Sequence, residues 1–355
     1  MLKFTKIILI NFLIVFLLLE ILSFFLIKVN ILPNGVTPNL IFYADEKLTY
    51  WHPKNSTFNI ATKCWSSKVR FNNYGLKSDN NLKIEKTKKR IAILGDSMTE
   101  NAQLSNDKDF TAKLQKLLPD FEILNFSVSS TGLADHIRIY NRLIDKFNID
   151  YLFYYVTLND FSDNHISKKR DNRITYAVSN EKPFEIDKDK SEFFKSYNSS
   201  WNKFKREKLI FLKNNLKIFI LYYEIKLALI YRGDNNKLKI KKKIKNNLIN
   251  EKAIVYKYLV NKANVEIFQK VPTLIFLNSD NINFIEETDE IKRIKKILEP
   301  FNFYDPRAEF IKILKQKKML KKPYLGYPCD FHYSELGANL LANYTFKIFE
   351  EFLKR

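Results

Sequence analysis

The chain has 355 residues, of which 46% are hydrophobic and 28% are charged, and its formal net charge at pH 7 is +21. This length suits one large domain or two small ones, and the apolar content is sufficient for a core, so the composition argues against an intrinsically disordered chain. The positive charge makes nucleic acid, anionic lipid and acidic polysaccharide candidate partners. Because no recognisable nucleic-acid-reading motif accompanies the charge, we expect no nucleic-acid partner.

The first thirty residues are strongly apolar. Between Lys6 and Lys28 lie 21 residues, interrupted only by Asn11, Glu20 and Ser23. At about 1.5 Å per residue they span roughly 30 Å, the thickness of a bilayer core. A cleaved signal peptide is the alternative, but the stretch is long for such a peptide and no small-residue cleavage site follows it. We predict an uncleaved, single-pass membrane anchor.

Flanking charges predict the orientation of this anchor. Lys3 and Lys6 precede the apolar segment, Lys28 follows it, and the next cation is Lys47. The positive-inside rule then predicts a cytoplasmic N-terminus and a periplasmic or otherwise extracytoplasmic body. We expect Glu20 to face a partner helix or to be tolerated at modest cost, and we assign it no functional site.

After the anchor, residues 31–89 show no sustained periodicity and are predicted to form a linker with short strands at the domain edge. Beyond them, short β-rich apolar runs alternate with segments of helical spacing, which predicts a parallel sheet. The predicted strands cover residues 91–94, 122–128, 151–158, 271–277 and 301–304. The predicted helices cover residues 110–118, 134–147, 286–298, 308–317 and 335–353.

Charged, mostly helical sequence without clear strands interrupts this alternation from residue 164 to residue 270. We interpret it as an insertion or cap between two strands of one sheet, because a separate domain would leave the sheet short. Within it, the basic stretch from Lys237 to Lys245 follows the apolar residues 216–230. These segments are suited either to lie on lipid headgroups or to form a solvated charged helix.

Cys64 and Cys329 are the only two cysteines. They are too few for a disulfide framework and wrongly spaced for zinc. In an extracytoplasmic body they could pair, which would tie the segment before the first sheet strand to the residue beside Asp330. Two buried free thiols are the alternative.

Ser97 lies in Gly95-Asp96-Ser97, directly after the apolar run Arg90-Ile91-Ala92-Ile93-Leu94. This position is the carboxyl end of a buried strand, where open α/β sheets carry their sites. A serine there needs a base, an orienting acid and oxyanion donors before it can act as a nucleophile.

The candidates for the base are the four histidines, His52, His136, His165 and His332. His52 is expected to be structural or exposed, His136 to be an uncharged surface residue, and His165 is a candidate to line the site. The context of His332 is the strongest, because Asp330 lies two residues before it and such side chains point the same way on extended backbone. Asp330 would then accept a hydrogen bond from the imidazole and fix its tautomer.

Together, these segments resemble the SGNH, or GDSL-like, serine hydrolase superfamily. The first block is residues 93–100 (ILGDSMTE), the third is Asn159-Asp160, and the last is Asp330-Phe331-His332 followed by Ser334 and Gly337. Residues 69–76 (VRFNNYGL) are similar to the lead-in of membrane-anchored bacterial members. The resemblance covers residues 70–355, and the order and spacing of the blocks make it specific.

The resemblance implies a three-layer α/β/α sandwich with a five-strand parallel sheet, and a site at the strand ends that needs no metal or cofactor. It implies that Ser97 is the nucleophile, His332 the base and Asp330 the orienting acid. The side-chain amide of Asn159 and the backbone N–H of Ser97 would donate to the oxyanion. The domains are then an anchor over residues 1–30, the linker and edge segment, and an SGNH-like domain over residues 90–355 that contains the insertion.

Three features depart from the family pattern. Ser130 stands where the second block carries a glycine whose N–H completes the oxyanion hole, and serine must hold the same geometry. Thr157 likewise replaces a glycine before Asn159. The spacing Asp-x-His, instead of Asp-x-x-His, resembles a branch that includes polysaccharide O-acetyltransferases as well as esterases.

The function predicted from this resemblance is a serine esterase that acts through an acyl-enzyme on an ester substrate outside the cytoplasm. One alternative is an O-acyltransferase that uses the same three residues to acylate a surface polysaccharide. A second alternative is a non-catalytic scaffold that binds glycan or an envelope partner. The expected partners are an acyl ester substrate, as part of a glycan or a lipid, and the membrane through the N-terminal helix.

Overall fold

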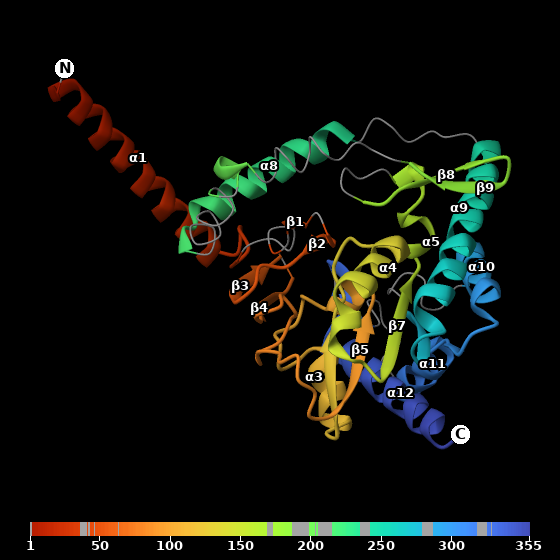
Figure 1. Cartoon of the computed structure of the whole chain (residues 1–355). Coiled ribbons are helices and arrows are strands. Elements are labelled where there is room, and N and C mark those ends of the chain that lie inside the picture. The colour runs from red at the N-terminus through yellow and green to blue at the C-terminus, as the bar shows by residue number, and fades with distance from the viewer. Residues whose placement is uncertain are drawn as a thin grey trace.

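The structure is a computed structural model of the chain (Figure 1). It describes residues 2–35, 41, 43–45, 47–62, 64–168, 173–186, 199–202, 204, 215–234, 242–278, 287–317, 325–327 and 329–355. Of the basic stretch noted in the sequence, residues 237–241 lie outside the described residues, and Lys242 begins helix α9 (Lys242–Ala263).

Five parallel strands form the central sheet in the order β11-β10-β7-β5-β6. They are β5 (Lys89–Leu94), β6 (Phe121–Asn125), β7 (Tyr151–Thr157), β10 (Thr273–Asn278) and β11 (Phe303–Tyr304). The middle strands are apolar along nearly their whole length, as expected for a parallel sheet that is covered on both faces. The predicted five-strand parallel sheet is therefore confirmed.

Helices cover both faces of this sheet. One face is packed by α3 (Phe110–Leu117), α11 (Arg307–Gln316) and α12 (Glu335–Leu353), and the other by α4 (Leu133–Arg142), α9 and α10 (Asp289–Leu298). Alternate residues of β5 pack on opposite faces of the sheet. Ile91 and Ile93 lie in the core under α3, α11 and α12, and Ala92 and Leu94 lie in the core under α4, α9 and α10. These three layers confirm the predicted α/β/α sandwich.

The segment before the sheet forms two hairpins at its edge. They are β1 (Tyr43–Asp45) with β2 (Thr49–Trp51), and β3 (Ser56–Ala61) with β4 (Ser66–Phe71). A disulfide joins Cys64 to Cys329, which directly precedes β13 (Asp330–Tyr333). β13 pairs with β12 (Gly326–Tyr327). Of the two states left open for the cysteines, the structure has the bridge, which links the edge hairpin to the strand that carries Asp330.

Helix α1 (Leu2–Lys28) projects away from the body of the molecule (Figure 1). Its segment Phe4–Lys28 contains an 18-residue stretch with a mean hydropathy of 2.8, of which 6% is buried, so the helix is long and apolar enough to cross a membrane. Its partner is helix α8 (Ile218–Asp234). The carboxylate of Glu20 accepts hydrogen bonds from the backbone N–H groups of Lys217 at 2.6 Å and Ile218 at 2.8 Å. Glu20 therefore faces a partner helix.

The segment between β7 and β10 contains strands, which the sequence did not predict. After the short helices α5 (Asp160–Asp163) and η3 (Ile166–Lys168), β8 (Tyr176–Ser179) and β9 (Lys182–Glu185) pair as a hairpin. Its two-residue turn places Asn180 and Glu181 at φ 49° and 60°, the left-handed backbone that tight hairpin turns require. The hairpin packs on α9, which also contacts α4 and α10 and leads through η4 (Asn264–Phe268) back to the sheet.

Candidate active site

Ser97 is the first residue of the short helix α2 (Ser97–Glu100) at the carboxyl end of β5. Asp96 caps this helix, because its Oδ1 accepts the backbone N–H of Met98 at 3.0 Å. A Cβ at Gly95 would lie 2.6 Å from Thr99 Oγ1 and 3.0 Å from the carbonyl oxygen of Tyr155, so only glycine allows this close turn. The turn leaves Ser97 partly exposed above the sheet, with residues on both sides of it buried.

Asp330 and His332 lie on β13 and form a hydrogen bond between Oδ1 and Nδ1. The same Oδ1 accepts the backbone N–H of His332 at 3.1 Å. The other carboxylate oxygen, Oδ2, accepts the indole N–H of Trp65 at 2.7 Å. Burial alone would raise the pKa of Asp330, but these bonds and the charge of His332 hold it below its usual value, so the group is an anion.

Strand β13 brings this pair against α2. Asn101, at the end of α2, donates from its side-chain amide to the carbonyl oxygen of Tyr333 at 3.1 Å. Burial lowers the pKa of His332, whereas Asp330 and the nearby carboxylates of Asp96 and Glu100 raise it, with a net rise above the usual value. His332 thus interacts with carboxylates on both sides of Ser97 in the sequence.

No hydrogen bond joins Ser97 Oγ to His332 within the part of the chain that the structure describes. Catalytic hydrogen bonds are often loose before substrate binds and tighten in the complex. The structure therefore places Ser97 and His332 on adjoining elements, with a hydrogen bond between His332 and Asp330.

Asn159 follows β7 and directs its side-chain amide toward two carboxylates. Its Nδ2 donates to Asp96 Oδ2 at 3.0 Å and to Asp163 Oδ2 at 2.8 Å. Thr157 donates from Oγ1 to Asp96 Oδ1 at 2.9 Å, so this threonine binds the residue beside Ser97. Burial raises the pKa of Asp96, although bonds from Asn159, Thr157 and Met98 oppose the rise. Asn159 must share or release one of these bonds to serve an oxyanion.

Ser130 follows β6 and adopts a φ of 67°, in the left-handed region. Among the described residues, its backbone N–H has no hydrogen-bond acceptor. Its carbonyl oxygen accepts the Nε–H of Arg173 at 2.6 Å. The preceding residue, Ser129, donates its backbone N–H to Glu100 Oε2 at 2.5 Å. Ser130 thus holds the backbone conformation that glycine adopts most easily, with its N–H available to a ligand.

His52 is buried and structural. Its Nε2 lies 3.1 Å from Glu100 Oε1, its Nδ1 lies 3.1 Å from the carbonyl oxygen of Gly75, and its ring stacks on Phe71. Of the two alternatives given for His52, the structural one is correct. Burial would raise the pKa of Glu100, but the charge and hydrogen bond of His52 and the bonds from Ser129 hold it below its usual value.

The expectation of a surface position for His136 is wrong. It lies in α4, fully buried, with Nε2 3.0 Å from Thr131 Oγ1 and Nδ1 3.0 Å from the Tyr154 hydroxyl. Burial, with a contribution from the charge of Arg173, lowers the pKa of His136 to about 3, so the ring is uncharged as expected. The prediction failed because residues 133–137, which form the first turn of α4, are all buried in the core.

Among the residues that the structure describes, no contact joins His165 to Ser97 or His332. It is buried after α5, with Nδ1 2.9 Å from Ser167 Oγ and Nε2 3.3 Å from a carboxylate oxygen of Glu251 in α9. Burial lowers its pKa, although the charge of Glu251 opposes this. Its role as a site-lining residue remains an untested prediction.

Sequence reasoning missed four residues that hold the site together, namely Trp65, Glu100, Asp163 and Arg173. Trp65 is adjacent to Cys64, so the paired cysteines were the one signal that could have placed it near Asp330. Glu100 lies within the first block, but nothing in the sequence indicates its contacts with His52 and Ser129. Asp163 and Arg173 lie outside the quoted blocks, and their positions depend on how the segment after β7 folds back. Within the described residues, no group of three or more His, Cys, Asp or Glu side chains is arranged to hold a metal ion.

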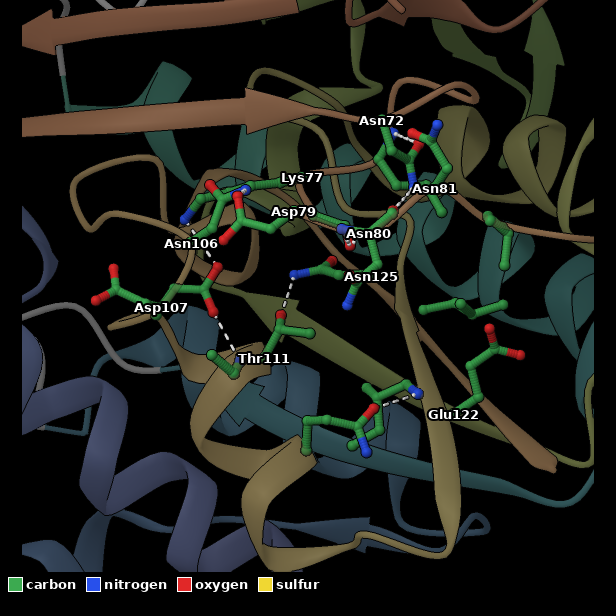
Figure 2. A pocket seen from close by; sticks show the side chains of 18 of the residues that line it. Asn72, Lys77, Asp79, Asn80, Asn81, Asn106, Asp107, Thr111, Glu122 and Asn125 are labelled. Atoms are coloured by element: carbon green, nitrogen blue, oxygen red, sulfur yellow. Dashed lines mark hydrogen bonds and ion pairs between the residues drawn. The ribbon is translucent and has the colours of Figure 1, made fainter. Parts of the chain in front are cut away.

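A polar pocket of about 340 Å³ lies apart from Ser97, between the loop after β4 and helix α3 (Figure 2). Its lining includes Asn72, Lys77, Asp79, Asn106 and Asn125. The Asn125 amide donates to Thr111 Oγ1 at 2.8 Å and to the carbonyl oxygen of Thr99 at 2.9 Å. Asn125, which lines this pocket, thus binds the backbone of α2 at Thr99. Ser97 and His332 do not line the pocket.

No family model matches the chain, and no curated protein sequence matches it. Solved structures with a similar arrangement include the acetylxylan esterase Axe2 from Geobacillus stearothermophilus, with 14% identity, 75% of this chain and 96% of that chain covered, and a TM-score of 0.39. TesA is 11% identical, with 74% and 99% covered and a TM-score of 0.37. A two-domain esterase active on acetylated mannans is 11% identical, with 75% and 50% covered and a TM-score of 0.38.

Proposed function

We propose that this protein is a serine esterase of the SGNH type, with Ser97 as nucleophile, His332 as base and Asp330 as orienting acid. One observation carries the proposal: the hydrogen-bonded Asp330–His332 pair lies on β13 against α2, the helix that begins with Ser97. A histidine whose Nδ1–H is held by a carboxylate presents its Nε2 as the proton acceptor. This is the arrangement that activates a serine hydroxyl.

In the acylation step, the Ser97 oxygen attacks the ester carbonyl while His332 accepts the hydroxyl proton. The imidazolium then gives that proton to the leaving alcohol, and the acyl group remains on Ser97. Water repeats the sequence with His332 as base, releasing the acid. Asp330 stays ionised throughout and stabilises the imidazolium, consistent with its lowered pKa.

The oxyanion of each tetrahedral intermediate needs preorganised donors. The N–H groups of Ser97 and Ser130 have no acceptor within the described residues, and the Asn159 amide lies beside Asp96. We assign these three groups to the oxyanion hole. Losing one such donor typically costs about 100- to 1000-fold in rate.

The same acyl-enzyme could pass its acyl group to a sugar hydroxyl in place of water, so the test must separate hydrolysis from transfer. The purified full chain is incubated with p-nitrophenyl acetate and longer acyl esters, with and without a polysaccharide acceptor. An esterase releases free acid at the same rate in both cases. Accumulation of acyl groups on the polysaccharide, detected by mass spectrometry, would instead identify a transferase.

The Ser97→Ala variant should abolish release, with Ser179→Ala as the matched control because Ser179 is an exposed serine on β8. Equal hydrolysis by Ser97→Ala and the wild type would contradict the assignment. An inert wild type would leave the non-catalytic scaffold as the explanation.

For location, we propose that α1 is retained as a membrane anchor and that the esterase domain faces outward. Glu20 supports retention, because removal of α1 would leave the backbone N–H groups of Lys217 and Ile218 without their carboxylate acceptor. In α8, which contacts α1, the exposed side chains of Tyr222, Ile225 and Leu229 follow helical spacing on one face. Such a face is suited to the bilayer surface.

Two measurements test this location. The measured mass of the mature protein should correspond to a chain that still contains residues 2–28. The protein should also resist carbonate extraction from membranes. A mature N-terminus beyond Lys28 would show a cleaved signal peptide and overturn the anchor.

A further inference from the structure

A continuous series of contacts connects Ser130 to Asn159 behind the proposed oxyanion hole. The Nε–H of Arg173 donates to the Ser130 carbonyl oxygen at 2.6 Å. Nη1 of the same guanidinium lies 3.1 Å from Asp163 Oδ1 and donates to the Asp163 carbonyl oxygen at 3.2 Å. The second carboxylate oxygen, Oδ2, accepts the Asn159 amide at 2.8 Å.

The Arg173–Asp163 pair is buried, with side chains that are 1% and 3% exposed. A buried ion pair is expensive to desolvate and is a weak source of stability in itself. Low exposure also makes its hydrogen bonds strong and directional, because water does not compete for them. The pair is therefore better suited to fixing positions than to adding stability.

Ser130 is the residue that needs such support. At φ 67° a serine pays a steric cost that glycine does not, so its backbone tends to rotate out of the left-handed region. Rotation about its N–Cα bond would break one of two hydrogen bonds. These are the bond from the Ser129 N–H to Glu100 and the bond from Arg173 to the Ser130 carbonyl oxygen. These two bonds hold the turn from both sides.

We propose that Arg173, fixed by Asp163, is a positioning residue that holds both Ser130 and Asn159 in the geometry of the oxyanion hole. Its hydrogen bond to the Ser130 carbonyl oxygen stabilises the left-handed backbone that glycine would adopt at position 130 without such support. This inference rests on the proposed esterase function and extends it to the segment between β7 and β10. That segment then supplies part of the catalytic scaffold, since Arg173 lies after α5 and before β8.

The test is a rescue experiment on the full chain. Arg173→Gln removes the charge, and Ser130→Gly removes the need for it. We expect Arg173→Gln to lower kcat for p-nitrophenyl acetate about 10- to 100-fold with little change in KM, because misplaced donors weaken the transition state more than the ground state. Measured from Ser130→Gly, the further fall in kcat on adding Arg173→Gln should be at least about 10-fold smaller than the fall that Arg173→Gln causes in the wild type.

Two further variants keep the result separate from misfolding. Arg90→Gln breaks another buried arginine contact, with Glu122 at 2.6 Å, at the opposite end of β5. It should lower the thermal midpoint without lowering kcat. Asp163→Asn retains an acceptor for Asn159 but not the ion pair, and should reduce kcat in the same way as Arg173→Gln.

The outcomes distinguish this inference from the proposed function. If the wild type hydrolyses the ester and Arg173→Gln keeps full kcat, the positioning role is wrong and the esterase stands. A loss in Arg173→Gln that Ser130→Gly does not recover also overturns the role at Ser130. A wild type with no turnover and no reaction with a fluorophosphonate contradicts the esterase itself.

Discussion

Replacing Asp330 by asparagine removes the charge that orients His332 while changing few atoms. Asp330 accepts three hydrogen bonds, from the His332 ring, the His332 backbone N–H and the Trp65 indole. An asparagine has one acceptor oxygen and one NH2 group that only donates. At least one of the three N–H donors would therefore face the NH2 group instead of an acceptor. Hydrogen bonds to charged groups contribute about 1.5–3 kcal/mol, and the variant should lose stability of that order.

The catalytic effect should be larger than the loss of stability. With asparagine at position 330, the His332 tautomer that presents Nε2 as a base is no longer enforced, and kcat should fall by about 10⁴-fold, roughly 5.5 kcal/mol of transition-state stabilisation. Asp330 also raises the pKa of His332 against the effect of burial. Because neutral His332 is the active form, the residual kcat/KM of Asp330→Asn should rise at lower pH than in the wild type.

The assay is a pH series of kcat/KM with p-nitrophenyl acetate for both proteins. Glu335→Gln is the matched control, because Glu335 is an exposed acid whose 3.3 Å pair with Lys113 should contribute little. Its profile should match the wild type. A near-normal kcat in Asp330→Asn, or a rise at the same or a higher pH, would refute the assigned role of Asp330.

Three more predictions concern the frame of the site. Serine at both Cys64 and Cys329 should lower the free energy of unfolding by about 2–5 kcal/mol in urea titrations, and equal stability of the oxidised and variant proteins would count against the bridge. Gly95→Ala should lose about 1–3 kcal/mol in thermal unfolding and some kcat, because its Cβ would lie 2.6 Å from Thr99 Oγ1; a neutral effect would contradict the close turn. His136→Gln should leave the pH profile between about pH 5 and 9 unchanged, since the pKa of His136 is about 3; loss of the main ionisation would identify His136 as the titrating base.

Most of the sheet and its helices could be predicted from periodicity. The final helix was expected over residues 335–353 and occupies Glu335–Leu353, because an apolar face continues without a glycine or proline break in its second half. The predicted helix over residues 134–147 is instead α4 followed by η2 (Ile144–Phe147). Asn148 ends η2 in the left-handed conformation, and the last turn before it is a 3-10 helix. The spacing of apolar residues does not distinguish such a turn from an α-helix.

The hairpin between β7 and β10 could not be predicted from alternation. Residues 176–185 lack a run of β-branched side chains, and the turn uses Asn180-Glu181, where glycine is the usual second residue. Its position is set by packing on α9, a contact distant in sequence. Tertiary packing decides such short strands more than local preference does.

At the site, the order of motifs placed Ser97, Asn159 and the Asp330–His332 pair at one edge of the sheet. What the sequence could not provide is the support behind them. Arg173 lies outside any motif, and its bond to Ser130 depends on the path of the chain after α5. The departure at Ser130 was visible in the sequence, but the contacts that offset it were not.

The most direct test of the central claim is covalent labelling of Ser97 by a fluorophosphonate probe. Mass spectrometry of the labelled wild type should find the adduct on the peptide that contains Ser97, because His332 activates this hydroxyl and the oxyanion donors stabilise the adduct. Ser97→Ala should not react, and His332→Ala should react at a strongly reduced rate. Absence of labelling in the folded wild type, or an adduct on a different serine that persists in Ser97→Ala, would contradict the account.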